Sequence, residues 1–114
     1  VAAVGGWDSD YLQKTRLSGT EVRIAPKSLK AAGREVVIVD DIIATGGTQA
    51  TASSMLLEQG ATAVYAACVH GVFASGAYMR LSGAGLAGIA ASDTIESAAS
   101  RISAAAIIAE AIRR

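Results

Sequence analysis

The chain has 114 residues, which is enough for one domain with a modest hydrophobic core but not for two. It carries 10 Lys and Arg residues against 10 Asp and Glu residues, so the charge balance gives no indication of binding to nucleic acid or to a membrane. No apolar run approaches the ~20 residues of a transmembrane helix, and the opening residues do not resemble a signal peptide. The single cysteine, Cys68, excludes an internal disulfide and suits a reducing compartment, so we expect a cytoplasmic protein.

The first third of the chain contains short elements separated by turns. Residues 1–6 are small and apolar and end in two glycines, which is typical of the end of a helix. Charged and apolar residues alternate from Glu21 to Ile24, which predicts a half-exposed strand. Pro26 ends this strand because proline offers no donor to a ladder, and Gly33 marks the next turn.

The most apolar strand follows this turn and leads into a loop and a helix. Glu35 to Val39 carries an uninterrupted β-branched run, which predicts a central strand buried on both faces. After the loop, Ala52, Met55 and Leu56 recur at i, i+3 and i+4. This spacing predicts a helix that ends with Gly60 in the C′ position.

The second half of the chain repeats the alternation of strand and helix. Residues 63–69 predict a second buried strand, 75–82 a short helix closed by a glycine-rich turn, and 86–91 a third strand. A final helix begins near Ser103, with four apolar residues on one face: Ile107, Ile108, Ala111 and Ile112. This order predicts an α/β fold in which right-handed βαβ units form a parallel sheet with flanking helices on both faces, within one domain over residues 1–114.

Three polar segments follow the predicted strands: 40–48, 70–71 and 92–94. In parallel sheets, ligands bind outside the carboxyl ends of the strands. Because all three segments are expected at that edge, the sequence predicts a single site there.

The first of these segments has the chemistry of a phosphate site. Thr45-Gly46-Gly47-Thr48 places two glycines between two hydroxyls at a helix N-terminus, where backbone N–H groups can turn toward an anion. No lysine follows the glycines, so this is not a Walker A loop. Asp40 and Asp41 precede the loop and can accept hydrogen bonds from sugar hydroxyls or hold Mg²⁺. Together these groups predict a ribose 5-phosphate site; the alternative is an ordinary strand-to-helix turn with two solvated aspartates.

These residues also carry a family resemblance. Val36–Thr48 resembles the signature of the type I phosphoribosyltransferase fold, which nucleobase transferases, regulators and phosphoribosyl pyrophosphate synthetases share. The flanking segments are similar to the archaeal ribose-phosphate pyrophosphokinases: 11–16, 19–22, 67–73, 92–95 and the closing helix. The resemblance covers essentially the whole chain.

The resemblance implies transfer of the diphosphoryl group of ATP to O1 of ribose 5-phosphate, giving phosphoribosyl pyrophosphate and AMP. Lys14 and Arg16 match the family's catalytic Lys-x-Arg pair, whose cations neutralise charge on the transferring phosphates. The expected contacts to ribose 5-phosphate are Asp40, Asp41, Ala44, Thr45, Gly46, Gly47 and Thr48. Ala44 departs from the serine or aspartate common in synthetases, but a backbone donor survives that change.

The resemblance further implies that partners are needed. The family enzyme has a second, amino-terminal domain that supplies most of the ATP site and the ligands of Mg²⁺, so we expect the metal ligands mainly outside this chain. The chain begins with Val1, and we expect it to be the carboxyl-terminal half of a two-domain synthetase, truncated at its N-terminus and inactive alone. A homo-oligomer is also expected, because the family assembles its sites across subunit interfaces.

Two alternative functions stay open. A nucleobase phosphoribosyltransferase would use the same loop but needs a hood for the base, and a non-catalytic synthetase-associated subunit would keep the fold alone. Lys14 and Arg16 argue against both. His70 and Asp93 are expected near the site with unresolved roles, whereas Cys68 is interpreted as a small core residue.

Overall fold

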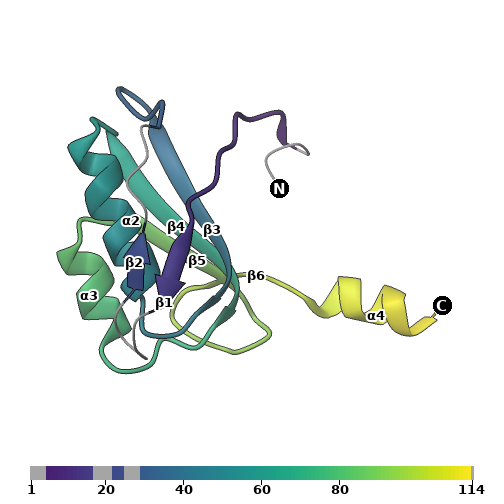
Figure 1. Cartoon of the computed structure of the whole chain (residues 1–114). Coiled ribbons are helices and arrows are strands. Elements are labelled where there is room, and N and C mark those ends of the chain that lie inside the picture. Colours follow the sequence, from purple (N-terminus) through teal and green to yellow (C-terminus); the bar gives the residue numbers. More distant parts are fainter. Residues whose placement is uncertain (1–4, 17–21, 25–28, 114) are drawn as a thin grey trace.

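The computed structural model describes residues 5–16, 22–24 and 29–113. Its larger unit is a four-stranded parallel sheet in the order β3-β4-β5-β6 (Figure 1). These strands are β3 (Glu35–Ile43), β4 (Ala63–Gly71), β5 (Gly88–Ser92) and β6 (Ser100–Ile102). The helices are α2 (Gly47–Glu58), α3 (Ala77–Gly83) and α4 (Ala105–Arg113). The predicted parallel sheet with flanking helices is therefore confirmed.

A separate two-stranded ribbon lies beside α2. β1 (Lys14–Arg16) pairs antiparallel with β2 (Val22–Ile24), with Lys14 opposite Ile24. The alternating pattern predicted β2, but β1 was not predicted as a strand. The predicted helix end at residues 1–6 lies mostly outside the described residues, since only its last two are described.

β3 differs from its prediction in length and in position. It runs to Ile43, so both aspartates belong to the strand and the loop begins only at Ala44. Within the described sheet β3 pairs with β4 alone, which places it at an edge, and the predicted central position is wrong. The register sets Asp40 opposite Cys68 and Ile42 opposite His70.

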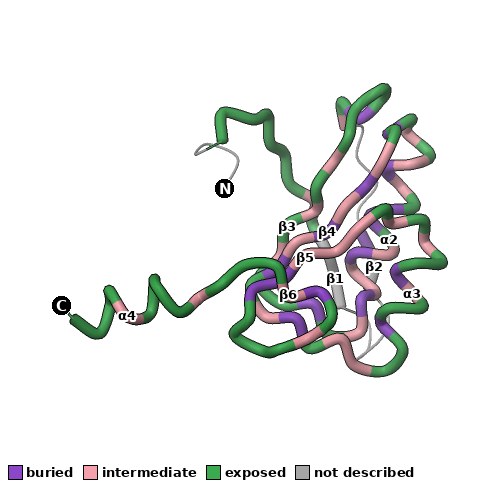
Figure 2. Tube along the Cα trace, turned by 180° about the vertical axis from the view of Figure 1, so that it is seen from behind, coloured by how far each residue is buried: buried purple, intermediate pink, exposed green. Residues whose placement is uncertain are grey.

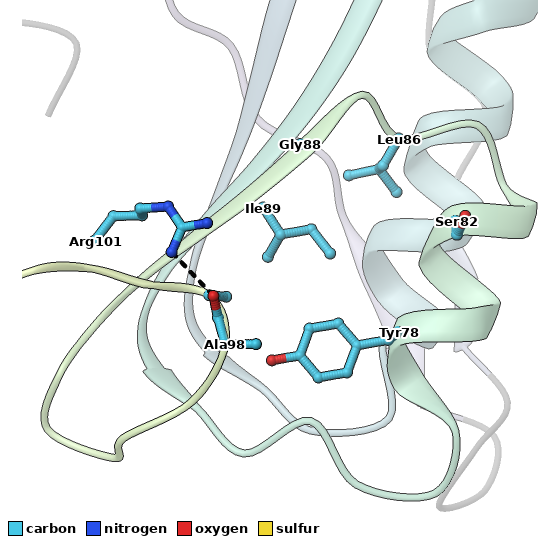
Figure 3. A pocket seen from close by; sticks show the side chains of 8 residues that line it. Tyr78, Ser82, Leu86, Gly88, Ile89, Ala98 and Arg101 are labelled. Atoms are coloured by element: carbon cyan, nitrogen blue, oxygen red, sulfur yellow. Dashed lines mark hydrogen bonds between the residues drawn. The ribbon is translucent and has the colours of Figure 1, made fainter.

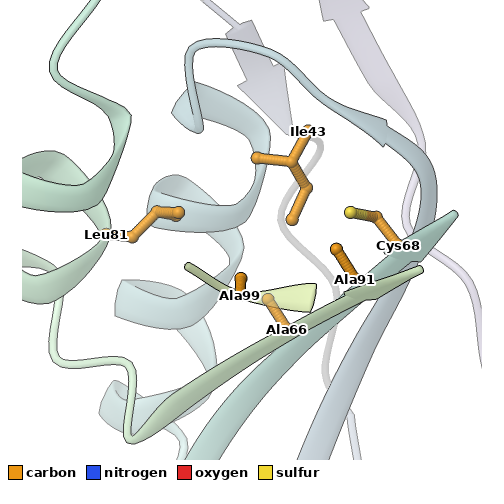
Figure 4. Close-up of a cluster of buried hydrophobic side chains, with 6 residues drawn as sticks. All are labelled: Ile43, Ala66, Cys68, Leu81, Ala91 and Ala99. Carbon is orange, nitrogen blue, oxygen red and sulfur yellow. The ribbon is translucent and has the colours of Figure 1, made fainter. Parts of the chain in front are cut away.

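The hydrophobic core lies on one face of the sheet, under α2 and α3. Figure 4 shows its main cluster, formed by Ile43, Ala66, Cys68, Leu81, Ala91 and Ala99. A second cluster joins Leu56 of α2 to Val64, with Val36 and Ile38 packed against it. Both helices therefore cover the face that carries Val36 and Ile38.

The opposite face of the sheet is open in the described part of the chain. Val37 is 56% exposed and Val39 is 53% exposed, because side chains alternate across the strand and neither α2 nor α3 reaches this face. The prediction that β3 is buried on both faces, and that helices cover both faces of the sheet, is wrong for the described residues.

The remaining predicted elements are present with shifted ends. α2 buries Ala52 and Leu56, and Gly60 follows it at φ 95°, which confirms the predicted C′ glycine. The predicted strand at 86–91 begins only at Gly88, and β6 was not predicted. No helix among residues 5–16, 22–24 and 29–113 is long and apolar enough to cross a membrane.

The C-terminal helix stands away from the sheet (Figures 1 and 2). α4 starts two residues after the expected Ser103, and none of its residues is buried. The predicted apolar residues do lie on this helix, but they do not pack against the sheet: Ile107 and Ile112 are 72% and 79% exposed. Ala104 immediately precedes this helix, and its N–H donates a hydrogen bond to Oδ1 of Asp93 at 2.8 Å.

The buried position of Cys68 predicts an unreactive thiol. Burial raises the pKa of the Cys68 thiol above its ordinary value, against a smaller lowering by the backbone of Ile43, and the Asp40 carboxylate adds to the rise. Only the thiolate is nucleophilic, so at pH 8 we expect alkylation at least about 10-fold slower in the folded chain than in urea. A colorimetric thiol titration checks this directly, because the chain has 1 cysteine. Equal rates in the two states would contradict a core position.

Candidate functional site

The loop after β3 lies against the loop after β4. The N–H groups of Val72 and Phe73 donate to the Ile43 carbonyl at 3.0 and 3.1 Å, and the Ala74 N–H donates to the Ala44 carbonyl at 2.8 Å. These bonds continue the β3–β4 pairing beyond the last strand residues. The predicted meeting of the polar segments at the carboxyl edge of the sheet is therefore observed for these two loops.

Gly46 is the point at which the strand end turns into the helix. It caps α2 with φ 82° and ψ 4°, a left-handed conformation that costs side-chain-bearing residues free energy. It is also packed closely, since a Cβ at this position would lie 3.0 Å from Cγ of Leu81. Both constraints select glycine at position 46.

The N-terminus of α2 has the electrostatics of an anion site. No side chain caps it and no acidic residue lies in its first turn. The carbonyl of the capping residue Gly46 accepts the first helical hydrogen bond, from the Ala50 N–H at 2.9 Å. The first N–H groups of a helix have no intrahelical acceptor and carry partial positive charge, so they can bind a phosphate. Thr45 and Thr48, the two predicted hydroxyl donors, flank this end of the helix.

Asp40 is oriented by the same helix. Its Oδ2 accepts a hydrogen bond from Nε2 of Gln49 at 3.0 Å, and its Oδ1 accepts one from the Asp41 N–H at 2.9 Å. Gln49 is 2% exposed, so its amide is held in the packed interior. Gln49 was not predicted as a site residue. The available signal was a polar side chain at the start of the buried 49–52–53–56 row of α2.

Asp41 is placed differently from Asp40. It is exposed, and its Oδ1 accepts a hydrogen bond from the Ile42 N–H at 2.8 Å. Successive residues of a strand point to opposite faces, so the two carboxylates do not form a pair on one side. Asp41 therefore binds the backbone at the end of β3, whereas Asp40 faces α2.

The described residues do not fit a resident magnesium ion. Among residues 5–16, 22–24 and 29–113 no three His, Cys, Asp or Glu side chains gather closely enough to hold a metal. Mg²⁺ in proteins takes carboxylate and water oxygens in an octahedral arrangement. Each oxygen of Asp40 accepts a hydrogen bond, and Asp41 lies on the other face of the strand, so no second carboxylate stands beside Asp40 to complete a metal site among the described residues.

His70 and Thr94 meet at the ends of β4 and β5. Nδ1 of His70 lies 2.8 Å from the Thr94 hydroxyl, which itself donates to the Val69 carbonyl at 3.1 Å. The hydroxyl of Ser92 donates to the same carbonyl at 2.6 Å. Because the Thr94 hydroxyl donates to Val69, the Nδ1 N–H of His70 would be the donor in its contact with Thr94. His70 thus joins two strand ends.

The two predicted catalytic residues lie on the ribbon. Lys14 and Arg16 are the first and last residues of β1, which pairs with β2, and β2 packs alongside α2. The structure describes the backbone of this pair and not the side chains. Their predicted role therefore stays a prediction.

An unpredicted residue also contacts the loop. Arg80 of α3 donates from Nη1 to the Thr45 carbonyl and from Nη2 to the Ser75 carbonyl, the latter at 3.3 Å. It lies 35 positions from Thr45 in the sequence, so no local pattern could have pointed to it.

Comparison with known proteins decides the family. The model of the family described as "Phosphoribosyl synthetase-associated domain" matches residues 28–114. The chain belongs to this family. Its relatives include a ribose-phosphate pyrophosphokinase of Methanosarcina acetivorans, 54% identical over 100% of this chain and 40% of the relative. Ribose-phosphate pyrophosphokinase 2 of Archaeoglobus fulgidus is 52% identical over 98% of this chain and 41% of the relative.

A solved structure agrees with these relatives. The crystal structure of phosphoribosylpyrophosphate synthetase from Mycobacterium smegmatis matches with a TM-score of 0.71 and 29% identity. The match covers 97% of this chain and 37% of that chain. The present chain thus spans about 40% of the length of the curated relatives that it matches.

The constraints on Gly46 predict the effect of adding one methyl group. Gly46→Ala should lower the free energy of unfolding by about 1–3 kcal/mol, because it combines a strained φ with a close approach to Leu81. Gly83→Ala is the matched control, since nothing lies within 4 Å of its added Cβ and its φ is not positive. This control should be neutral or stabilise α3 by up to about 1 kcal/mol. Urea unfolding of both variants checks the difference, and equal stabilities would contradict it.

Proposed function

We propose that this chain is the carboxyl-terminal domain of a ribose-phosphate pyrophosphokinase. Residues 1–114 would form one phosphoribosyltransferase-like domain that binds ribose 5-phosphate and presents it to ATP. The observation that carries the proposal is the uncapped N-terminus of α2 beside Asp40, a carboxylate oriented by the buried Gln49. This arrangement offers donors for a phosphate and acceptors for sugar hydroxyls at one edge of the sheet.

The opposite charges of these two parts orient the substrate. The 5-phosphate, a dianion, is attracted to the N–H groups of residues 45–48 and repelled by the carboxylates. Its oxygens would accept hydrogen bonds from the backbone of Ala44 to Thr48 and from the hydroxyls of Thr45 and Thr48. The ribose would lie toward Asp40, whose oxygens accept hydrogen bonds from its hydroxyls, while Asp41 would order the backbone at the end of β3.

The proposed reaction forms one bond and breaks one. The O1 hydroxyl of ribose 5-phosphate attacks the β-phosphorus of ATP, the bond from that phosphorus to the α-phosphate oxygen breaks, and AMP leaves. The O1 proton is released during the attack. Negative charge spreads over the transferring group, and Lys14 and Arg16 would neutralise it. Magnesium would accompany ATP, with its ligands mainly outside this chain.

We also propose that a partner covers the exposed apolar residues of β3 and α4. Exposed β-branched residues on the edge strand β3, together with the unpacked isoleucines of α4, support contact with an amino-terminal half or with a second copy of the chain. The proposed setting is the cytoplasm, where a free thiol such as that of Cys68 stays reduced.

Substrate binding tests the proposal through Asp40. The isolated chain should bind ribose 5-phosphate in a calorimetric titration, and Asp40→Asn should weaken this binding by about 10-fold through loss of a charged acceptor. The same variant should bind inorganic phosphate at least as well as the unmodified chain, because it removes a nearby negative charge. Asp8→Asn, at an exposed residue paired with Arg34, is the control and should change neither affinity. Parallel loss of both ligands in Asp40→Asn would contradict the assigned orientation.

Catalysis tests the cationic pair. We propose to replace the matching segment of the Methanosarcina acetivorans relative by this chain and to measure AMP release from ATP with ribose 5-phosphate. Lys14→Ala and Arg16→Ala should each lower kcat by about 100-fold or more, with KM for ribose 5-phosphate changed by only a few fold. Lys30→Ala, at an exposed lysine, is the matched control.

Two outcomes of this assay would count against the proposal. The isolated chain should release no AMP, so robust turnover without a second domain would overturn the two-domain assignment. Activity that instead consumes a nucleobase together with phosphoribosyl pyrophosphate and releases pyrophosphate would favour a nucleobase phosphoribosyltransferase.

A further inference from the structure

We propose that Arg80 is a positioning residue for the phosphate-binding loop. Through its bond to the Thr45 carbonyl it holds the peptide between Thr45 and Gly46 in the orientation that turns the Gly46 N–H toward an anion. This inference rests on the proposed function of the loop as the site of the 5-phosphate.

Because the peptide bond is planar, the direction of its carbonyl also fixes the direction of its N–H. The Thr45 carbonyl and the Gly46 N–H belong to one trans peptide unit and point in opposite directions. Since the Arg80 guanidinium binds the carbonyl, the N–H points away from Arg80. Among the described residues nothing accepts a hydrogen bond from the Gly46 N–H. The fixed carbonyl therefore leaves an oriented donor beside the open N-terminus of α2.

Glycine makes such a restraint necessary. Gly46 can adopt many backbone conformations, so the peptide before it can rotate and present its oxygen in place of its N–H. An inward oxygen would repel a phosphate. Leu81 blocks part of this freedom by packing on Gly46, and Arg80, its neighbour on α3, fixes the carbonyl. These two adjacent residues of α3 thus restrain the same peptide.

Arg80 also joins the loop to its neighbour. Its second bond goes to the Ser75 carbonyl in the β4–α3 connection. That connection is strained, since Phe73 and Ser75 have φ of 51° and 52°. It is tied to the phosphate loop by the Ala74 N–H on the Ala44 carbonyl. One guanidinium therefore restrains both loops, which requires a forked donor and not a single ammonium.

The fixed charge of Arg80 acts in the same direction. A guanidinium stays protonated at all physiological pH values, and here it lies on the loop that would carry a dianion. Its charge polarises the Thr45–Gly46 peptide and strengthens the N–H as a donor. Arg80→Lys keeps the charge and loses the fork, so it separates these two contributions.

Arg101 provides a matched control. It makes the same kind of contact, donating from Nη1 to the carbonyls of Ala98 and Ser100 at 2.9 and 3.2 Å. It lies on the wall of the cavity between α3 and β5, among Tyr78, Leu86 and Ile89 (Figure 3). Arg101→Ala thus removes an equivalent arginine–carbonyl contact without touching the Thr45 peptide.

The first measurement needs no ligand. Backbone amide NMR of the ligand-free chain should show a large change in the Gly46 resonance in Arg80→Ala, and faster hydrogen exchange at Ala74. Arg101→Ala should leave both unchanged. An unchanged Gly46 resonance in Arg80→Ala would overturn the inference, whatever the chain binds.

The second measurement is affinity, determined by calorimetric titration with ribose 5-phosphate and with inorganic phosphate. Arg80→Ala should weaken both by about 10- to 100-fold, because the Gly46 N–H, a hydrogen-bond donor to the charged phosphate, would no longer be held toward it, and Arg80→Lys should recover part of that loss. Arg101→Ala should bind within about 2-fold of the unmodified chain, a change too small for a lost charged hydrogen bond. Equal affinity of Arg80→Ala and the unmodified chain would overturn the inference.

The outcomes also separate this inference from the proposed function. Absence of binding by the unmodified chain would count against the proposed function, while the Gly46 resonance would still test Arg80. If Arg80→Ala fails to fold, Arg80→Lys carries the test. Full affinity and an unchanged Gly46 resonance in Arg80→Lys would then overturn the requirement for a fork.

Discussion

The structure depends on one buried left-handed turn at Gly46. This residue must reverse the chain from the end of β3 into α2 within van der Waals reach of Leu81. The turn brings the open end of the helix next to the last residues of the strand, and it carries Gln49 back toward Asp40. The proposed phosphate donors and the oriented carboxylate therefore both depend on this one turn. A change at this turn would alter both parts of the site together.

The pleat of β3 divides the two neighbouring carboxylates. Asp40 lies on the face that α2 covers, where a buried amide fixes it, and Asp41 lies on the exposed side and binds the adjacent backbone N–H. A pair of aspartates in sequence suggests a shared metal or a shared sugar contact. Since the strand continues to Ile43, the two side chains have different neighbours: the Gln49 amide for Asp40 and the Ile42 N–H for Asp41.

Local signals carried most of the sequence prediction, and non-local contacts account for what it missed. β-branched runs and glycines located β3, α2 and β4, because strand propensity and left-handed turns are properties of a few adjacent residues. The position of β3 at an edge depends on which strands exist to pair with it, which no run of valines encodes. Likewise, the side chains of Gln49 and Arg80 donate to acceptors that lie 9 and 35 positions away in the sequence, so no local pattern marks them as site residues. The sequence Ser100–Ile102 has no strand pattern of its own, and β6 forms because these residues pair with β5.

In the proposed function, the division between covered and open surfaces would also separate binding from catalysis. The contacts that shape the loop come from α2, α3 and the β4–α3 connection, all within the core-bearing part of the fold. The apolar residues left exposed lie on the other face of the sheet and on α4, and burying each such side chain would contribute about 1.5–3 kcal/mol. A partner that covers them would stabilise the domain without contacting the elements that shape the loop. In the proposed function, phosphate binding would therefore belong to this chain, whereas transfer from ATP would require groups brought by a partner on its open side.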